Sequence, residues 1–391
     1  QTLPIMLRFL INAKRNIVRN KVYAFINFTG LSIGISLTLL IFIFVREEVS
    51  YDKFHSKSDR IYRLKYALPA QGMELASSPP PIAPKLADNF SDVETTARVF
   101  GRNVSIKRDD DKGIVFEEVD VYFVDTTFNK IFDLEFLSGN PSTALAENQV
   151  IITDEMAEKY FGEVNPIGQT LNFSDRISFS VSGVVKKFPS NSHLVFNMLL
   201  PYDNMFDLER PSTAQRMKDN LLVNYVISHS YSYVLIKEGG DPKSVDEGMQ
   251  KFMEDNANPN MLLGQIFTLM PLQEIHLSST LLAEPSATNS WSNINLFIAV
   301  SFLTLLIASI NYINLATAQS FSRIKEIGIK KALGSGKGQL ISQFLSETFL
   351  FVIISILASY LVMYIALPVF NDLTGKEFNY FDVVDSQLLL I

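Results

Sequence analysis

Three long stretches of this chain carry no charged side chain, and they constrain its fold more than any other feature. They cover residues 22–45, 293–320 and 348–370. The first stretch would form roughly 36 Å of helix at about 1.5 Å per residue, whereas the hydrocarbon core of a bilayer is about 30 Å thick. We therefore expect three transmembrane helices. A cleavable signal peptide is a poor alternative for the first stretch, because its apolar part would be only about 7 to 15 residues long.

The positively charged residues indicate which side of the membrane each connecting segment occupies. Residues 1–21 contain Lys and Arg but no acidic residue, and residues 322–339 contain several Lys and Arg against the single acidic Glu326. Short cytoplasmic segments accumulate Lys and Arg, whereas translocated segments do not. Both segments are therefore expected inside, which places residues 47–290 outside.

The segment expected outside is large and acidic. Residues 46–290 contain 23 basic and 35 acidic residues, which gives a net charge of −12. A segment of this length can build its own hydrophobic core, and without cysteine it does so without disulfide bonds. Its residue patterns predict a mixed α+β domain. Strands are expected at 61–68, 114–124, 177–185 and 225–236, and helices at 154–161, at 243–255 and, after three prolines, within 77–90.

The expected fold class is an α-helical transmembrane bundle, with three spans and the start of a fourth, that carries a large mixed α+β extracytoplasmic domain between spans 1 and 2. Because a new apolar run begins near 387, we expect the sequence to be a fragment. The expected segments are a cytoplasmic amphipathic interfacial helix (1–21), spans 1 to 3 (22–46, 291–321 and 340–370), the extracytoplasmic domain (47–290), a cytoplasmic helix with a glycine turn (322–339), an external loop (371–386) and the start of span 4 (387–391). For 1–21, a soluble helix packed on the chain's own cytoplasmic parts is the alternative.

Small and amide side chains within the spans suggest contacts between helices. Gly30 and Gly34 form a G-x-x-x-G pair, a spacing that lets another helix approach closely, although glycine is common in membrane helices. Asn311 and Asn314 lie near the inner end of the second span, and an amide in lipid needs a hydrogen-bond partner across a helix interface. Interhelical bonding is the simpler interpretation of the two amides, and a substrate path is the alternative.

The sequence gives little support for a catalytic or metal site. The four histidines, His55, His193, His229 and His276, are far apart and form no H-E-x-x-H motif, so no metal site is expected. There is neither a cysteine nor a G-x-S-x-G nucleophile elbow. A pair of catalytic carboxylates stays open, but an acidic solvated surface is the default interpretation.

The glycine-rich stretch at 334–338 looks like part of a phosphate-binding loop but lacks its pattern. The P-loop requires G-x-x-x-x-G-K-[ST], and here Lys331 replaces the first glycine and Gly338 replaces the hydroxyl residue. We interpret the stretch as a tight turn in which Gly334 ends one helix before the next begins. The basic residues around it are explained by topology and anionic lipid, and no nucleic-acid partner is expected.

Four stretches of the chain carry a family resemblance. They are YDKFHSKSDRIYRL (51–64), DEMAEKYFGEVNPIGQTL (154–171), VSGVVKKFPSNSH (181–193) and EIGIKKALGSGKGQLISQFLSE (326–347). In these stretches the chain resembles the permease subunits of ABC transporters of the MacB and FtsX type, in the group with an N-terminal-type extracytoplasmic core domain. Together with the spacing of the spans, the resemblance covers nearly the whole chain.

The resemblance implies that the loop between spans 2 and 3 is a coupling helix that docks on a cytoplasmic ABC ATPase dimer. The expected ATPase-coupling residues are Arg323, Ile324, Lys325, Glu326, Ile327, Gly328, Ile329, Lys330, Lys331 and Gly334. Glu347 is expected either to brace this loop by pairing with Lys330 or Lys331, or to be solvated at the interface. No cofactor is expected on this chain, because ATP and Mg²⁺ would bind the ATPase. Since only 21 residues precede the first span, the ATPase is expected to be a separate subunit.

The resemblance also implies a function without a catalytic site in this chain. A multi-pass protein of the bacterial cytoplasmic (inner) membrane is expected, surrounded by lipid and paired with a second permease unit, with a periplasmic adaptor or exported partner as a further candidate. The leading expectation is export or extraction of an amphiphile such as an antimicrobial peptide, a lipophilic drug or a lipoprotein. The alternative is an FtsX-like mechanotransmitting regulator of an exported enzyme such as a cell-wall hydrolase. A membrane receptor normally has two spans, so the third span argues against that class.

Overall fold

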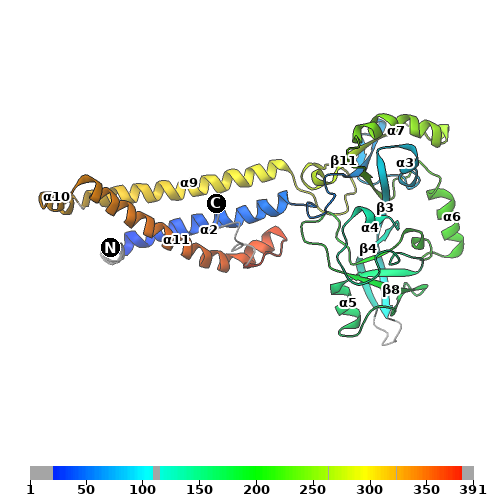
Figure 1. The fold of residues 1–391 in the computed structure, drawn as a ribbon, viewed down its shortest axis with the longest axis horizontal. Helices are drawn as coiled ribbons and strands as arrows, with labels where there is room; N and C mark the ends of the chain where they lie inside the picture. Colours follow the sequence, from blue (N-terminus) through cyan, green and yellow to red (C-terminus); the bar gives the residue numbers. More distant parts are fainter. Residues whose placement is uncertain (1–20, 109–114, 263, 323, 381–391) are drawn as a thin grey trace. The chain divides into compact units, whose positions relative to one another are not determined.

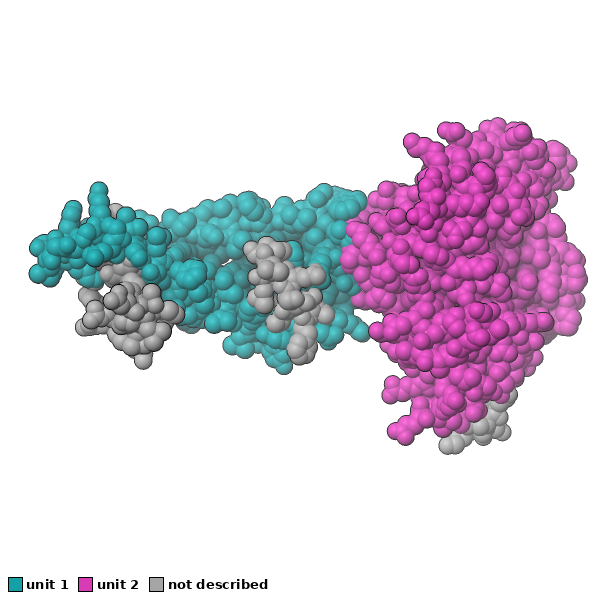
Figure 2. Space-filling view, in the orientation of Figure 1, with its two compact units in different colours: residues 1–49, 291–391 teal, residues 50–290 magenta. Residues whose placement is uncertain are grey.

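The structure, a computed structural model, describes residues 21–108, 115–262, 264–322 and 324–380. It divides into two compact units, residues 1–49 with 291–391 and residues 50–290, which Figure 2 shows in different colours. Apart from its last residue, the expected interfacial helix at 1–21 lies outside the described residues, as does the expected start of span 4 at 387–391.

Three helices of the first unit are long and apolar enough to cross a membrane (Figure 1). They are α2 (Lys21–Val49), α9 (Trp291–Ser322) and α11 (Lys337–Thr374), and the short α10 (Ile324–Ala332) lies between the last two in the chain. Helix α11 is longer than the expected span 340–370 at both ends. It is already capped at Gly336, and it continues until Gly375 takes up the left-handed conformation, with φ of 66°.

Small residues allow α2 to pack against both of the other long helices. A Cβ atom placed on Gly34 of α2 would lie 2.7 Å from the Cβ of Ala308 in α9. On the α11 side, the Ser32 hydroxyl donates a 3.2 Å hydrogen bond to the carbonyl of Ser355. Close approach through glycine, alanine and serine is the usual means of helix association in lipid, where no hydrophobic force drives the helices together.

The second unit is built on one mixed sheet, with eleven strands among the described residues. The strands are β1 (Ile61–Leu68), β2 (Met73–Leu75), β3 (Val93–Arg108), β4 (Val115–Val124), β5 (Phe136–Gly139), β6 (Gln149–Thr153), β7 (Thr170–Phe173), β8 (Ile177–Val185), β9 (Met198–Pro201), β10 (Tyr231–Ile236) and β11 (Ile266–Pro271). The helices are α3 (Ala83–Asn89), α4 (Phe128–Ile131), α5 (Asp154–Phe161), α6 (Pro211–Leu221), α7 (Pro242–Asn256) and α8 (Ile275–Ser278), with 3₁₀ turns η1 (Pro69–Gln71), η2 (Tyr202–Met205), η3 (Pro259–Met261) and η4 (Leu272–Glu274).

The sheet has an open part and a closed part. The open part runs β11-β1-β10-β3-β4 and is antiparallel throughout. The closed part is a ring of six strands, in which β3 pairs with β4, β4 with β9, β9 with β6, β6 with β8, β8 with β7, and β7 again with β3. Strand β3, which has 16 residues, and strand β4 therefore belong to both parts.

Three hydrophobic clusters hold this unit together. One fills the ring, and each of its six strands contributes to it: Ile106, Phe123, Ile152, Phe173, Phe179 and Leu200 come from β3, β4, β6, β7, β8 and β9 in turn. A second lies between the open part of the sheet and α3 and α7. The third joins strands of both parts. Helices α3 and α7 lie at one end of this unit and α5 lies at the other (Figure 1).

Most of the expected elements are present, with one clear difference. Strands β1 and β8 and helix α5 have the expected bounds. The strand expected at 225–236 begins only at Tyr231. Its first half forms a turn instead, because the Asn224 side-chain oxygen accepts hydrogen bonds from the backbone N–H groups of Val226 and Ile227.

The ring cluster predicts a strong position dependence along β4. Phe123→Ala removes a fully buried ring and is expected to lower the free energy of unfolding by about 3–5 kcal/mol. Val119→Ala, at a half-exposed position on the same strand, is expected to change it by less than about 0.5 kcal/mol. Denaturant unfolding of residues 50–290 expressed alone measures both values. Similar losses for the two variants would contradict the assigned core.

Candidate functional site

Helix α10 presents apolar side chains between two membrane-length helices. Ile324 and Ile329 are 59% and 63% exposed, and Leu333, directly after the helix, is 82% exposed. Ile327 is half-buried. A nine-residue helix with exposed isoleucines and an exposed lysine, Lys331, has the character of a docking surface, since large apolar side chains gathered on one exposed segment mark interaction sites.

The expected turn after α10 is present and is well defined. Gly334 is left-handed, with φ of 92°, and its N–H donates to the carbonyl of Lys331. The N–H of Ser335 donates to the carbonyl of Lys330. This pair of bonds is the Schellman arrangement that ends helices at glycine. Because a helix precedes the turn where a P-loop needs a strand, the geometry also argues against phosphate binding.

Some expected coupling residues cannot be placed. Arg323 lies outside the described residues, and the side chains of Lys325, Glu326 and Glu347 lie outside the described part of their helices. The bracing contact expected for Glu347 therefore stays a prediction. Gly328 is exposed on α10, with nothing within 4 Å of a Cβ placed there.

The expected helix-packing residues are partly brought together. Gly30 lies next to Asn311, whose side-chain nitrogen is 3.8 Å from the position of a Cβ on Gly30. Asn311 and Asn314 are both exposed on α9. Among the described residues, neither amide has a hydrogen-bond partner, so the structure does not supply the bond that the sequence leads us to expect.

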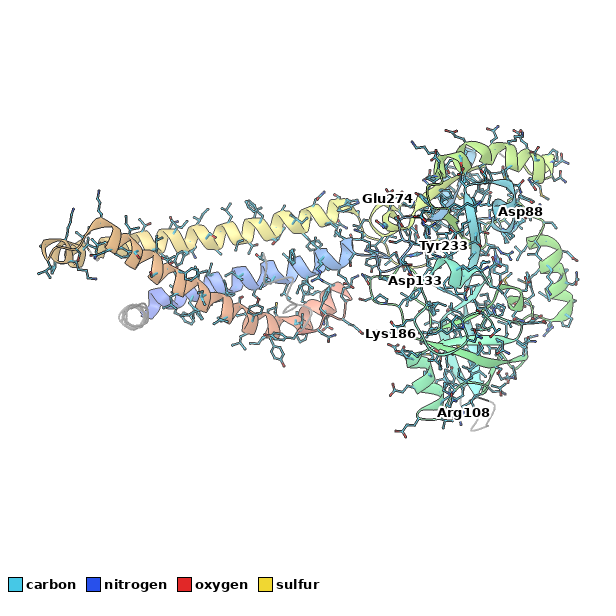
Figure 3. The ribbon with its side chains drawn as sticks, in the orientation of Figure 1. Asp88, Arg108, Asp133, Lys186, Tyr233 and Glu274 are labelled. Carbon is cyan, nitrogen blue, oxygen red and sulfur yellow. The ribbon has the colours of Figure 1, made fainter. Side chains whose placement is uncertain are left out.

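A buried polar cluster in the second unit was not expected from the sequence. It lies where the chain enters this unit after α2 and leaves it before α9. The carboxylate of Asp52 accepts hydrogen bonds from the backbone N–H of His193 at 3.1 Å and from the Ser192 hydroxyl at 3.2 Å, and lies 2.9 Å from His193 Nδ1. The other ring nitrogen of His193 is 2.7 Å from the hydroxyl of Tyr233, which Figure 3 labels.

Asp52 is fully buried, and its partners keep it charged. Burial by itself raises the pKa of this carboxyl. The charge of His193, the hydrogen bonds from that residue and the nearby His55 outweigh burial, so the pKa of Asp52 lies below its ordinary value. Asp52 also has a left-handed backbone, with φ of 58°, which is uncommon outside glycine.

His55 is a packed, neutral residue beside this cluster. Its ring lies among Phe54, Phe132 and Phe188, and its Nδ1 accepts a 3.2 Å hydrogen bond from the backbone N–H of Asp133. Burial lowers the pKa of His55 to about 4, and the charge of Asp52 only partly offsets this. The imidazole is therefore uncharged at neutral pH.

His229 is a second neutral histidine, two residues before β10 begins. Its ring stacks on Phe100, with centroids 4.1 Å apart, and its Nδ1 lies 2.8 Å from the Ser230 hydroxyl. Burial and the nearby charge of Arg98 lower the pKa of His229 to about 4. The described residues contain no group of three or more His, Asp or Glu side chains that could hold a metal ion.

The comparisons with known proteins agree with this architecture. Residues 24–252 match the family described as the MacB-like periplasmic core domain, and residues 298–390 match the FtsX-like permease C-terminal family. MacB of Aggregatibacter actinomycetemcomitans, a macrolide export ATP-binding/permease protein, is 24% identical over 244 residues, which are 59% of this chain and 33% of that protein.

Two further proteins are similar to this chain. The uncharacterized ABC transporter permease YknZ of Bacillus subtilis is 24% identical over 242 residues, which are 57% of this chain and 53% of that protein. The chain therefore spans about a third to a half of the length of these relatives. A crystallised domain of a protein described as a permease, from Porphyromonas gingivalis, is 22% identical with a TM-score of 0.46, and the match covers 56% of this chain and 92% of that domain.

Membrane-length helices on either side of a large mixed domain define this chain as a multi-pass membrane protein of the permease type. The core-domain match covers more than half of the chain, and the chain therefore belongs to the MacB and FtsX family of ABC transporter permeases. In this family the mixed domain, residues 50–290 here, is periplasmic.

The contact between α2 and α9 gives a matched pair of variants. Gly34→Ala places a methyl group 2.7 Å from Ala308 and is expected to destabilise the helical unit by about 1–3 kcal/mol. Gly30→Ala makes only an ordinary 3.8 Å contact and is expected to change little. Thermal unfolding of the full chain in detergent, followed by the fluorescence of Trp291, measures both. Equal melting temperatures would contradict the close approach at Gly34.

The buried histidines predict a loss of stability in acid. Because folding lowers the pKa of His55 from 6.5 to about 4, the unfolded chain binds a proton that the folded chain does not. Stability is therefore full above pH 6.5 and falls as the pH drops to 4, by roughly 3 kcal/mol for this residue. Protonation of Asp52 adds a loss only below its ordinary pKa of 3.8.

Melting temperatures of residues 50–290 between pH 8 and pH 4 measure this effect. His229 has a similar shift, so His55→Leu and His229→Leu are each expected to remove about half of the pH dependence. An unchanged pH dependence in His55→Leu would show that His55 is not the titrating group.

Proposed function

We propose that this chain is the membrane subunit through which an ABC ATPase moves an extracytoplasmic domain, and that this motion exports or extracts an amphiphile. The ATPase dimer would dock from the cytoplasm on α10 and bind the ATP and Mg²⁺. A second permease unit would complete the assembly in the bacterial inner membrane. The MacB relatives, which are described as macrolide export ATP-binding/permease proteins, support this proposal.

One observation carries the proposal: α10 is a short helix with exposed isoleucines, and in the chain it lies between two membrane-length helices. The Schellman turn at Gly334 fixes its exit, and α11 begins two residues beyond Ser335. A push on Ile324 or Ile329 would thus reach α9 and α11 through only a few residues of chain.

The energy would come from differential contact with the ATPase. A ligand shifts a conformational equilibrium only by the difference between its affinities for the two states. The ATPase dimer would change shape when it closes on ATP, so its affinity for α10 would differ between its open and closed states. The lysines around the isoleucines, such as Lys331 and Lys337, would steer an acidic surface of the ATPase to this helix and keep the helix on the cytoplasmic side.

The coupling role is tested by removing the isoleucine side chains. The triple variant Ile324→Ala, Ile327→Ala and Ile329→Ala is expected to weaken binding of the ATPase at least tenfold, because apolar anchors carry most of the energy of an interface. Val223→Ala, at a position 61% exposed in the periplasmic unit, is the control. The full-length protein in nanodiscs is titrated with the ATPase, and ATP turnover is recorded. Unchanged affinity and turnover in the triple variant would refute the docking site.

Transport is separated from regulation in a strain that lacks the gene. Export of candidate amphiphiles and activity of cell-wall hydrolases are measured in the same cells. We expect export to fall while hydrolase control stays normal. Normal export with lost hydrolase control would replace the transport proposal with the regulatory alternative.

A further inference from the structure

Two of the stretches that carry the family resemblance meet in the fold although more than a hundred residues separate them. Asp52 and His55 come from the stretch 51–64, and Ser192 and His193 come from the end of the stretch 181–193. They meet in the buried cluster of the periplasmic unit, which the function proposed above does not use. We call Asp52, Ser192, His193, Tyr233 and Ser286 the His193 joint.

The joint holds the segment that follows α2. The backbone N–H of Asp52 donates a 2.8 Å hydrogen bond to the carbonyl of Asn191, and the side chain of Asn191 donates to the hydroxyl of Ser50 at 2.8 Å. With the three contacts of the Asp52 carboxylate, residues 50–52 are fixed to residues 191–193 by both backbone and side-chain bonds.

The same joint holds the segment that leads to α9. The hydroxyl of Ser286 donates a 2.9 Å hydrogen bond to the backbone carbonyl of His193. We call the segment that follows α2 the incoming segment and the segment that leads to α9 the outgoing segment. His193 thus contacts the incoming segment through its ring and N–H, and the outgoing segment through its carbonyl. Through Tyr233, which is fully buried in β10, it is also tied to the middle of the sheet.

A buried ion pair reinforces the outgoing segment. Arg63 of β1 is fully buried, and its two terminal nitrogens each lie 2.6 Å from an oxygen of Glu284, which is a bidentate arrangement. In addition, the ring of Tyr51 stacks on the ring of His276 at 3.4 Å, and the N–H of Asn289 donates to the carbonyl of His276. Noncovalent contacts therefore connect the incoming and outgoing segments at more than one point.

We propose that the His193 joint fixes the segment that follows α2 and the segment that leads to α9 to each other and to the sheet, so that these two segments move as one rigid pair. His193 is the positioning residue of this joint. The use of the joint in force transmission rests on the function proposed above, but the rigidity of the joint does not. A buried carboxylate cannot lose its partners without a large penalty, and so the joint resists being pulled apart.

Distances between spin labels test the joint in the full chain. The sequence has no cysteine, so cysteines introduced at the exposed positions Lys53 and Thr288 give one labelled pair across the two segments. Cysteines at Glu158 and Lys251, exposed on α5 and α7, give a control pair away from the joint. The protein is placed in lipid nanodiscs, and the distribution of label distances is measured for each pair.

The native joint is expected to give a single narrow distribution for the 53–288 pair. His193→Ala and Asp52→Asn are expected to broaden it at least twofold and to leave the control pair unchanged. His193→Asn, whose amide can still donate to Asp52, is expected to restore most of the narrow distribution. A narrow distribution in both His193→Ala and Asp52→Asn, with the control pair unchanged, would refute the joint.

If these substitutions unfold the domain, the distance distribution of the control pair broadens as well. In that case a milder variant tests the joint. Tyr233→Phe keeps the packing and removes only the hydroxyl that meets His193. It is expected to broaden the 53–288 distribution and leave the control pair narrow, and no broadening at all would refute the link to the sheet.

Adding the ATPase with ATP and orthovanadate separates this inference from the proposed function. In the native protein the 53–288 distance is expected to stay constant, whereas in Asp52→Asn it is expected to widen further. A native distance that changes with ATP would refute the rigid pair. Failure of the isoleucine variants to affect the ATPase would refute the docking site and leave the label distances of the joint as they are.

Discussion

The hydrocarbon interior of the membrane imposes the constraint on which the other features depend. Within it every backbone N–H and C=O must find a partner inside the protein, and an isolated helix is the simplest solution. In the described part of the chain three helices meet this requirement, and α2 packs on the other two through Gly34 and Ser32. Helices α9 and α11 are joined by a short connection, whereas α2 and α9 are joined by a self-contained domain on the other side of the membrane.

That domain is held together by apolar clusters, and its buried polar groups fix particular segments of the chain to one another. The ring and the open sheet share β3 and β4, and one cluster contains residues from both of them. Asp52 and Arg63 are both fully buried. Asp52 lies three residues after α2 and is paired with His193, whereas Arg63 lies in β1 and is paired with Glu284 on the segment that leads to α9. This placement suits a role in holding the fold rather than in chemistry.

The spans, the topology and several elements of the domain could be predicted from the sequence because each depends on local pattern. The uncharged runs, the distribution of lysines and the glycine turn at 334 can each be recognised in one continuous stretch of sequence. The ring was not predicted, because β6, β7 and β9 have only four or five residues and gain their stability from pairing with distant strands. The joint was missed for the same reason. The spacing of Asp52 and His193 in the sequence does not indicate that they pair. The only sequence feature that they share is that each lies in a stretch of family resemblance.

The ring occupies one continuous piece of sequence, from β3 to β9, between the outer strands of the open sheet. Such an insertion would normally be a module that can be exchanged between relatives without disturbing the rest. Here the connection between β8 and β9 carries His193, which holds both the segment after α2 and the segment before α9. A transplanted ring would bring its own half of that joint with it. The smallest piece of this protein that can be exchanged as a unit is therefore the whole of residues 50–290.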